Sequence, residues 1–140
     1  MKRLLFIISL MILGITVKSQ IASTKMQLSA TEHDFGTFKE EAGRQSFDFI
    51  VTNTGTEPLV IQNVQASCGC TTPTWTKDPI EAGKKGAITV TYSTAGRIGV
   101  FTKTITVYTN DPQESVVLTI TGEVIKMKEG ETVTKAPKTN

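Results

Sequence analysis

The chain has 140 residues, enough for one domain with an ordinary hydrophobic core, and its formal net charge is +2. Three of its 15 basic residues, Lys2, Arg3 and Lys18, lie within residues 1–19, where there is no acidic side chain. The rest of the chain has 12 basic and 13 acidic side chains and a net charge of −1, which leaves no basic surface for phosphates and argues against nucleic acid as a partner.

Residues 1–19 have the features of a secretory signal peptide. Lys2 and Arg3 provide the positive start, and residues 4–17 form a nearly unbroken apolar run. This run is shorter than the roughly 20 residues of a membrane-spanning helix. We expect cleavage near Ser19 and Gln20, a periplasmic or secreted mature protein, and no stable membrane span after cleavage. A retained membrane anchor is the alternative interpretation.

Residues 20–125 are predicted to form one all-β domain of about seven short strands, followed by a flexible tail at residues 126–140. The first strand is expected at a sheet edge, near Met26 and Leu28, and a bend around Gly36 follows it. The tail is charged, rich in threonine and without apolar periodicity. No stretch of the mature chain has the periodicity of an amphipathic helix.

Two central strands are predicted on either side of a turn at residues 53–58. The first strand alternates polar residues with three apolar ones, Phe47, Phe49 and Val51. This period of two indicates a half-buried strand. After the turn, Leu59 and Ile61 resume the alternation. The apolar residues then shift by one position at Val64 and Ala66, which predicts a bulge or the end of the strand.

The second half of the chain contains the remaining predicted strands. Trp75, flanked by Thr74 and Thr76, predicts a short edge strand. Three longer strands follow, each with apolar residues on one face: Ile88, Val90 and Tyr92; Phe101, Ile105 and Val107; and Val116, Leu118, Ile120 and Val124. Short strands at this spacing, separated by turn residues, predict an antiparallel β-sandwich.

Two motifs resemble a known family. The pattern Phe-x-Phe-x-Val-x-Asn-x-Gly-x-x-Pro-Leu-x-Ile over residues 47–61 resembles the immunoglobulin-like domains related to major sperm protein and to the repeats of Hydin. With Ser-Cys-Gly-Cys-Thr at residues 67–71, Gly83, Thr-Asn-Asp at 109–111 and Gly122, the chain is similar to a bacterial family of exported proteins of unknown function that is common in Bacteroidetes. The resemblance covers about residues 33–124. It implies an immunoglobulin-like β-sandwich and brings no established activity.

The only two cysteines, Cys68 and Cys70, are the one place where chemistry beyond packing is plausible. They are too close in sequence to pin two distant strands across a core, and three interpretations stay open. A local disulfide suits an oxidising compartment, and Gly69 would act as the hinge that brings the two residues together. Two thiolates could instead bind a soft metal ion, although four ligands are needed for a closed zinc site. Two reduced, buried thiols are the third interpretation.

The sequence predicts a binding module and not an enzyme. It contains no G-x-S-x-G motif, no phosphate-binding glycine loop and no paired carboxylates. No cofactor is expected, and the partner is predicted to be another protein or an envelope component. Trp75 is a candidate for an interaction surface, although a lone tryptophan is more often part of the core. A sheet edge, near Leu28 or at residues 74–76, is a candidate for strand addition. The alternative function is a small periplasmic thiol-redox or soft-metal protein that uses Cys68 and Cys70.

Overall fold

The computed structural model describes residues 24–111 and 115–126. The predicted signal peptide at residues 1–19, its cleavage site and residues 127–140 of the predicted tail lie outside this part. The described residues form one short 3-10 turn, Glu40–Ala42, and eight strands: β1 (Met26–Leu28), β2 (Glu32–Lys39), β3 (Gln45–Asn53), β4 (Ile61–Ala66), β5 (Thr71–Trp75), β6 (Lys85–Tyr92), β7 (Gly99–Thr109) and β8 (Val116–Ile125). No helix in the described ranges is long and apolar enough to span a membrane.

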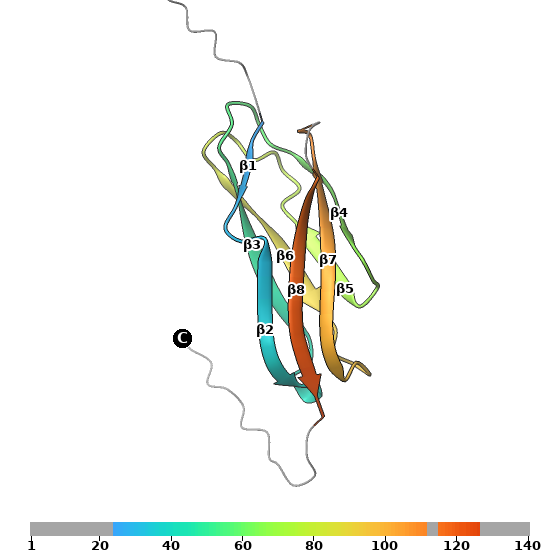
Figure 1. Cartoon of the computed structure of the whole chain (residues 1–140). Coiled ribbons are helices and arrows are strands. Elements are labelled where there is room, and N and C mark those ends of the chain that lie inside the picture. Colours follow the sequence, from blue (N-terminus) through green and yellow to red (C-terminus); the bar gives the residue numbers. More distant parts are fainter. Residues whose placement is uncertain (1–23, 112–114, 127–140) are drawn as a thin grey trace, which may run out of the picture.

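The strands form two four-stranded sheets that pack face to face as a β-sandwich (Figure 1). The strand order is β1-β3-β6-β5 in the first sheet and β2-β8-β7-β4 in the second sheet. The all-β sandwich expected from the strand spacing is therefore confirmed. The two short strands predicted near Leu28 and Trp75 are β1 and β5, and they form the two edges of the first sheet, as expected.

Two details of the fold differ from the prediction. The region around Gly36, expected as a bend, belongs to β2, which continues past a register shift between Asp34 and Thr37. Gly36 has a φ of +68°, a conformation that only glycine adopts without strain, so the bend is absorbed as a bulge within the strand. In addition, β2 pairs with β8 in parallel, whereas all other strand pairs are antiparallel. The chain crosses from the first sheet to the second between β1 and β2, and β2 then lies beside the last strand, β8, and runs in the same direction.

The core lies between the sheets and contains the residues that the alternation predicts. Its members include Phe49, Val51, Leu59, Ile61, Val64, Ile88, Val90, Tyr92, Phe101, Ile105, Val107, Leu118, Ile120 and Val124. The Tyr92 ring stacks on Phe101 at 3.9 Å between centroids. The predicted shift of the apolar residues in β4 is also confirmed, because the pairing with β7 changes register between Ile61 and Asn63.

Asn53, at the end of β3, is a fully buried polar residue that joins three backbone segments. Its amide nitrogen donates hydrogen bonds to the carbonyl oxygens of Glu57 and Ile80, each at 2.8 Å. Its side-chain oxygen accepts a hydrogen bond from the Gly55 amide at 2.9 Å. The residue therefore closes the 53–58 turn and also ties it to the loop before β6.

Candidate functional site

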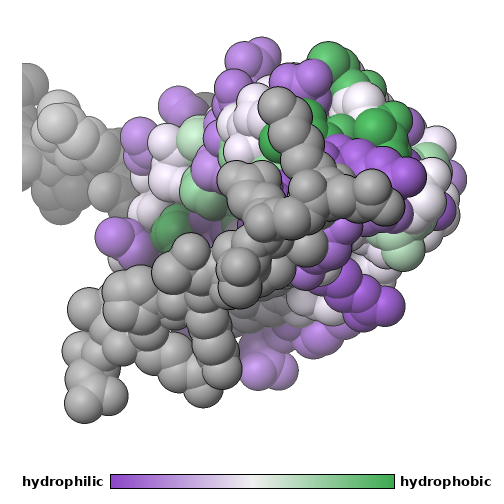
Figure 2. Space-filling view, turned by 90° about the horizontal axis from the view of Figure 1, so that it is seen from below, coloured by the Kyte–Doolittle hydropathy of each residue, from purple (hydrophilic) through white to green (hydrophobic). Residues whose placement is uncertain are grey.

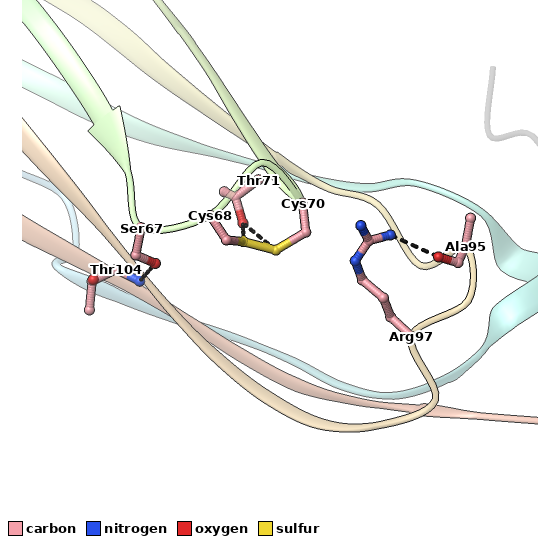
Figure 3. Close-up of a disulfide and its surroundings, with 7 residues drawn as sticks. All are labelled: Ser67, Cys68, Cys70, Thr71, Ala95, Arg97 and Thr104. Carbon is pink, nitrogen blue, oxygen red and sulfur yellow. Dashed lines mark hydrogen bonds between the residues drawn. A yellow bond between two sulfur atoms is a disulfide. The ribbon is translucent and has the colours of Figure 1, made fainter.

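Cys68 and Cys70 form a disulfide at one end of the connection between β4 and β5 (Figure 3). Their Cα atoms are 5.3 Å apart, within the usual range for bridged cysteines. Cys70 is buried, with 7% of its surface exposed, whereas Cys68 is half-buried. Gly69 between them is exposed, and a Cβ atom placed there would meet nothing within 4 Å. Of the three interpretations of this pair, the structure contains the local disulfide.

The loop is attached to both sheets by hydrogen bonds that do not involve sulfur. On one side, the Ser67 amide donates to the Thr104 carbonyl of β7 at 2.9 Å, and the Ser67 hydroxyl accepts from the Thr104 amide at 3.2 Å. On the other side, the Ser93 amide donates to the Cys70 carbonyl at 2.9 Å. The two cysteines are therefore held where the edges of the two sheets meet, independently of the disulfide.

The Thr71 hydroxyl lies within hydrogen-bond distance of both sulfur atoms of the disulfide. It lies 3.7 Å from Sγ of Cys68 and 3.8 Å from Sγ of Cys70 (Figure 3). A disulfide sulfur has no hydrogen, so the hydroxyl is the donor and shares its proton between the two sulfur atoms. Thr71 is itself buried, so this donor is fixed in place and is shielded from water.

Two basic residues, for which the sequence carries no signal of its own, lie on segments next to the disulfide loop. Arg97 donates a hydrogen bond to the Ala95 carbonyl at 2.7 Å, and its guanidinium points toward Cys70 in the view of Figure 3. The strand register places Lys103 opposite Cys68. Ser67 pairs with Thr104 and the two segments are antiparallel, so the residue before Thr104 lies beside the residue after Ser67. Lys103 is half-buried and occupies a core-facing position of β7 between Phe101 and Ile105.

The Arg97 charge also acts on a buried phenol beside the loop. Tyr92 pairs with Thr71 across the first sheet. Burial raises the pKa of Tyr92, and the nearby positive charge of Arg97 opposes part of this increase. The loop that carries Arg97 also holds a negative charge, because the Gly96 amide donates a hydrogen bond to the Glu40 carboxylate at 2.6 Å. The disulfide end of the sandwich is therefore a partly buried region with charges of both signs beside it.

Trp75 is a structural residue that connects the edges of the two sheets. Its indole nitrogen donates a hydrogen bond of 3.0 Å to the carbonyl of Ile61, on the edge strand β4 of the second sheet. The ring packs against the core, and Nζ of Lys77 lies 3.0 Å above the ring centre. The exposed ring face that a recognition surface needs is thus occupied by a neighbouring side chain.

Replacing Trp75 with phenylalanine should remove the indole hydrogen bond and lower the free energy of unfolding by about 1 kcal/mol. Replacing Lys77 with glutamine, the matched control, should cost about 0.5 kcal/mol through loss of the cation–π contact. Urea unfolding followed by tryptophan-independent circular dichroism measures both. If the phenylalanine variant were as stable as the wild type, the hydrogen bond from the indole to the Ile61 carbonyl would contribute nothing to the free energy of unfolding.

Pro73 blocks the free edge of β5. The Thr76 amide donates to the Ala87 carbonyl and the Ser93 amide to the Cys70 carbonyl, so the even-numbered residues of β5 direct their backbone groups toward β6. Pro73 therefore faces the free edge, where it has no N–H to offer to an added strand. Strand addition at residues 74–76, one of the two edges predicted for it, is disfavoured by this geometry.

The other three edges are also poorly suited to strand addition. Strand β1 has only three residues. In β2 the bulge at Gly36 interrupts the edge, and the Asp34 carboxylate accepts a hydrogen bond from the Gly36 amide at 2.9 Å. In β4 the Ile61 carbonyl is already bonded to Trp75. Short length, bulges, charges and covered groups are the usual means by which proteins protect sheet edges.

The outer faces of the two sheets differ in character. On the first sheet, polar side chains bond to one another: Ser46 to Thr91 at 2.8 Å, and Thr89 to Asp48 at 2.6 Å. On the second sheet, the outward residues include exposed large hydrophobic side chains. We refer to the outer face of β7 and β8, together with Ile98 immediately before β7, as the apolar face.

The apolar face contains all five exposed large hydrophobic residues found in the described part of the chain. They are Ile98, Val100, Tyr108, Val117 and Ile125. Val100 is 80% exposed, Ile98 53% and Val117 50%. Figure 2 looks at the end of the sandwich where β7 begins and β8 ends, and it shows hydrophobic surface at the upper right beside hydrophilic residues.

One protein family matches most of the chain. Residues 26–124 match the family described as "Protein of unknown function (DUF1573)". The chain belongs to the DUF1573 family. The expectation of a domain-of-unknown-function family is therefore confirmed, whereas the relationship to major sperm protein and Hydin stays a prediction. No curated protein matches the sequence.

Solved structures similar to this DUF1573 domain share its fold at low sequence identity. A protein of unknown function from Porphyromonas gingivalis W83 has a TM-score of 0.64 and 18% identity over 79% of this chain and 51% of its own. The Vibrio cholerae VesB protease gives 0.54 and 14%, over 76% and 32%. The YadV chaperone gives 0.50 and 18%, over 74% and 53%. The chain thus spans about half the length of these proteins or less, and the likeness shows the fold alone.

A shallow hollow of about 230 Å³ lies on the outer side of the second sheet of the DUF1573 domain. It is lined by Asp34, Gly36, Thr37, Val100, Thr121, Gly122 and Glu123. The carboxylates of Asp34 and Glu123 accept hydrogen bonds from the Gly36 amide and the Thr37 hydroxyl, so neither is free. No group of three or more metal-ligating side chains occurs within residues 24–111 and 115–126. The hollow is best described as a depression next to Val100 in the apolar face.

Proposed function

We propose that this DUF1573 protein is an exported, immunoglobulin-like module that binds another protein or envelope component through its apolar face. The observation that carries the proposal is the placement of every exposed large hydrophobic residue of the described chain on β7, on β8 or immediately before β7. Single exposed hydrophobic residues are common on protein surfaces, whereas groups of them on one face, here one group at each end, are typical of interaction sites.

The chemistry of this face suits a partner protein with a mixed apolar and polar surface, because the Glu123 carboxylate lies beside Val100. The apolar residues lie at its two ends, with Tyr108 and Val117 at one end and Ile98, Val100 and Ile125 at the other. Between them are threonines of both strands, Thr102, Thr104, Thr106, Thr119 and Thr121. A threonine hydroxyl costs less to desolvate than a charged group and can donate or accept a hydrogen bond, so the face combines apolar contacts with adaptable hydrogen bonds.

Two further parts of the proposal rest on the sequence. Export is supported by the signal-peptide features of residues 1–19. A binding role for this face, in place of catalysis, is supported by the lack of any recognised catalytic motif in the sequence. The face replaces Trp75 and the sheet edges as the preferred interaction surface, because Trp75 bonds to β4 and the edges are protected.

The proposal is tested by site-specific photo-crosslinking in the envelope of the native host. A photoreactive residue at Val100 or Val117 should give a crosslinked partner, whereas one at Thr74, exposed on the outer face of the first sheet, should not. Replacing both valines with threonine keeps strand propensity and should weaken partner binding by about tenfold or more. Equal crosslinking from Thr74, or unchanged binding by the double variant, would refute the apolar face as the site.

A further inference from the structure

We propose that the Cys68–Cys70 disulfide is a site of thiol–disulfide exchange with the cysteine thiols of another exported protein. This activity goes beyond the proposed binding role and does not rest on it, because the disulfide lies at the β4–β5 connection and not on the apolar face. A disulfide with one intervening residue closes a minimal loop and adds little to stability through chain entropy. A purely structural role is therefore a weak explanation for this pair.

The difference in exposure between the two sulfur-bearing residues sets the direction of attack. Cys70 is almost fully buried, whereas Cys68 is half-buried and is preceded and followed by exposed residues. Gly69 leaves open space beside the bond, since a Cβ atom there would contact nothing within 4 Å. An incoming thiolate can therefore reach Sγ of Cys68 more easily than Sγ of Cys70.

The surroundings favour the departure of Cys70 as a thiolate. Exchange is faster when the leaving thiol has a low pKa, and hydrogen-bond donors and cations lower a thiol pKa. The Thr71 hydroxyl already lies 3.8 Å from Sγ of Cys70 and can donate fully to the thiolate once the bond to Cys68 is broken. Arg97, whose guanidinium points toward Cys70 in the view of Figure 3, supplies positive charge on this side, whereas Lys103 lies opposite Cys68 in the register of β4 and β7.

The exchange takes place in two steps with a partner that has two cysteine thiols. First, one partner thiolate attacks Sγ of Cys68 and forms a mixed disulfide, while the electron pair of the broken bond goes to Sγ of Cys70. Next, the second partner thiolate attacks the partner sulfur of the mixed disulfide and releases the Cys68 thiolate. The partner loses two electrons and two protons and becomes a disulfide, and Cys68 and Cys70 gain them as two thiols.

The loop should keep its position in the fold when the disulfide is reduced. Its attachments to β7 through Ser67 and to β6 through the Cys70 carbonyl are backbone or hydroxyl hydrogen bonds that need no disulfide. Reduction should therefore leave the sandwich folded, with both thiols still next to each other. A folded reduced state is what a reversible exchange site requires.

The wild-type protein provides the first test. The exported protein with its disulfide closed is equilibrated with mixtures of reduced and oxidised glutathione, alkylated, and weighed by mass spectrometry. We expect half of the molecules to show two free thiols at a glutathione ratio that leaves the cross-core disulfide of a reference immunoglobulin domain closed. A Cys68–Cys70 bond as resistant as the reference bond would overturn the proposal.

Variants then test the direction of attack and the role of the surroundings. With Cys70→Ser, Cys68 should form a mixed disulfide with oxidised glutathione about tenfold faster than Cys70 does in Cys68→Ser. Thr71→Val and Arg97→Gln should each slow the reduction of the wild-type disulfide several-fold, whereas the control Lys85→Gln, on an exposed residue of β6, should not. Thermal melts establish that each variant is folded.

A peptide with two cysteine thiols is the final probe. Each molecule of oxidised protein should convert one peptide to its disulfide and gain two free thiols. Equal reactivity of the two cysteine variants would refute attack at Cys68. Failure to oxidise the peptide would refute the exchange activity, and neither result would bear on binding at the apolar face.

Discussion

Replacing Asn53 with alanine should lower the free energy of unfolding by about 3 kcal/mol. The side chain is fully buried and makes three hydrogen bonds, two to the carbonyls of Glu57 and Ile80 and one from the Gly55 amide. Alanine removes the partner of the Gly55 amide and of the Glu57 carbonyl, and it leaves the buried Ile80 carbonyl with only its hydrogen bond from the Leu59 amide. The loss exceeds that of an ordinary exposed hydrogen bond because buried polar groups are costly when unsatisfied.

Asn110 provides the matched control for Asn53. It also joins a turn to a neighbouring segment, since its side chain accepts from the Val60 amide at 2.9 Å and donates to the Pro58 carbonyl at 3.0 Å. Asn110 is exposed, so water can replace it, and alanine there should cost only about 1 kcal/mol. Urea unfolding of both variants gives the comparison. Equal losses would show that the burial of Asn53 adds nothing to its contribution.

Replacing Gly122 with alanine should cost about 2 kcal/mol through overpacking. A Cβ atom at this position of β8 would lie 2.8 Å from Cζ of Phe101 and 3.1 Å from the carbonyl oxygen of Gly36. The Phe101 ring cannot move away freely, because it stacks on Tyr92 at 3.9 Å. The added methyl group therefore forces either the ring or the β2 bulge to shift.

Gly69 is the control for Gly122. A Cβ atom at Gly69 would meet nothing within 4 Å, and its backbone is not in the left-handed region. Alanine at Gly69 should therefore change stability by less than about 0.5 kcal/mol. Thermal unfolding with the disulfide intact measures both variants under the same conditions. A similar, small change in both would mean that the space beside Phe101 is larger than the structure indicates.

The two outer faces of the sandwich differ in the side chains that they offer to a partner protein. On the first sheet, Ser46 is bonded to Thr91 and Thr89 to Asp48, so these four side chains are less available to a partner. The second sheet presents valine and threonine on its two central strands, with apolar groups at both ends. The face is therefore a better candidate for binding than the sheet edges that the sequence alone favours.

The chemical state of the two cysteines could not be predicted from the sequence alone. The spacing of Cys68 and Cys70 identified the pair, and it left a disulfide, a metal site and free thiols all open. The groups that would tune its chemistry, Thr71, Arg97 and Lys103, come from different parts of the chain. Arg97 and Lys103 had no signal of their own in the sequence, because an isolated basic residue in a loop or strand is ordinarily a solvated surface residue.

The sequence by itself determined the all-β class, the core residues and the position of the main turns. These features depend on local patterns: the period of two in a strand, and the preference of asparagine, glycine and proline for turns. For this reason the buried faces of β3, β6 and β7 agree with the alternation, and the register shift in β4 could be predicted from its apolar residues.

Only the tertiary structure decided which strands are neighbours, which side chains are buried and which groups they bond to. The parallel pairing of His33 with Ile120 joins residues far apart in the sequence, and no local pattern encodes it. The burial of Asn53, the hydrogen bond from Trp75 to Ile61 and the outward direction of Pro73 depend on such pairings. The physical reason is that burial and hydrogen-bond partners are properties of packed sheets, whereas periodicity is a property of a single strand.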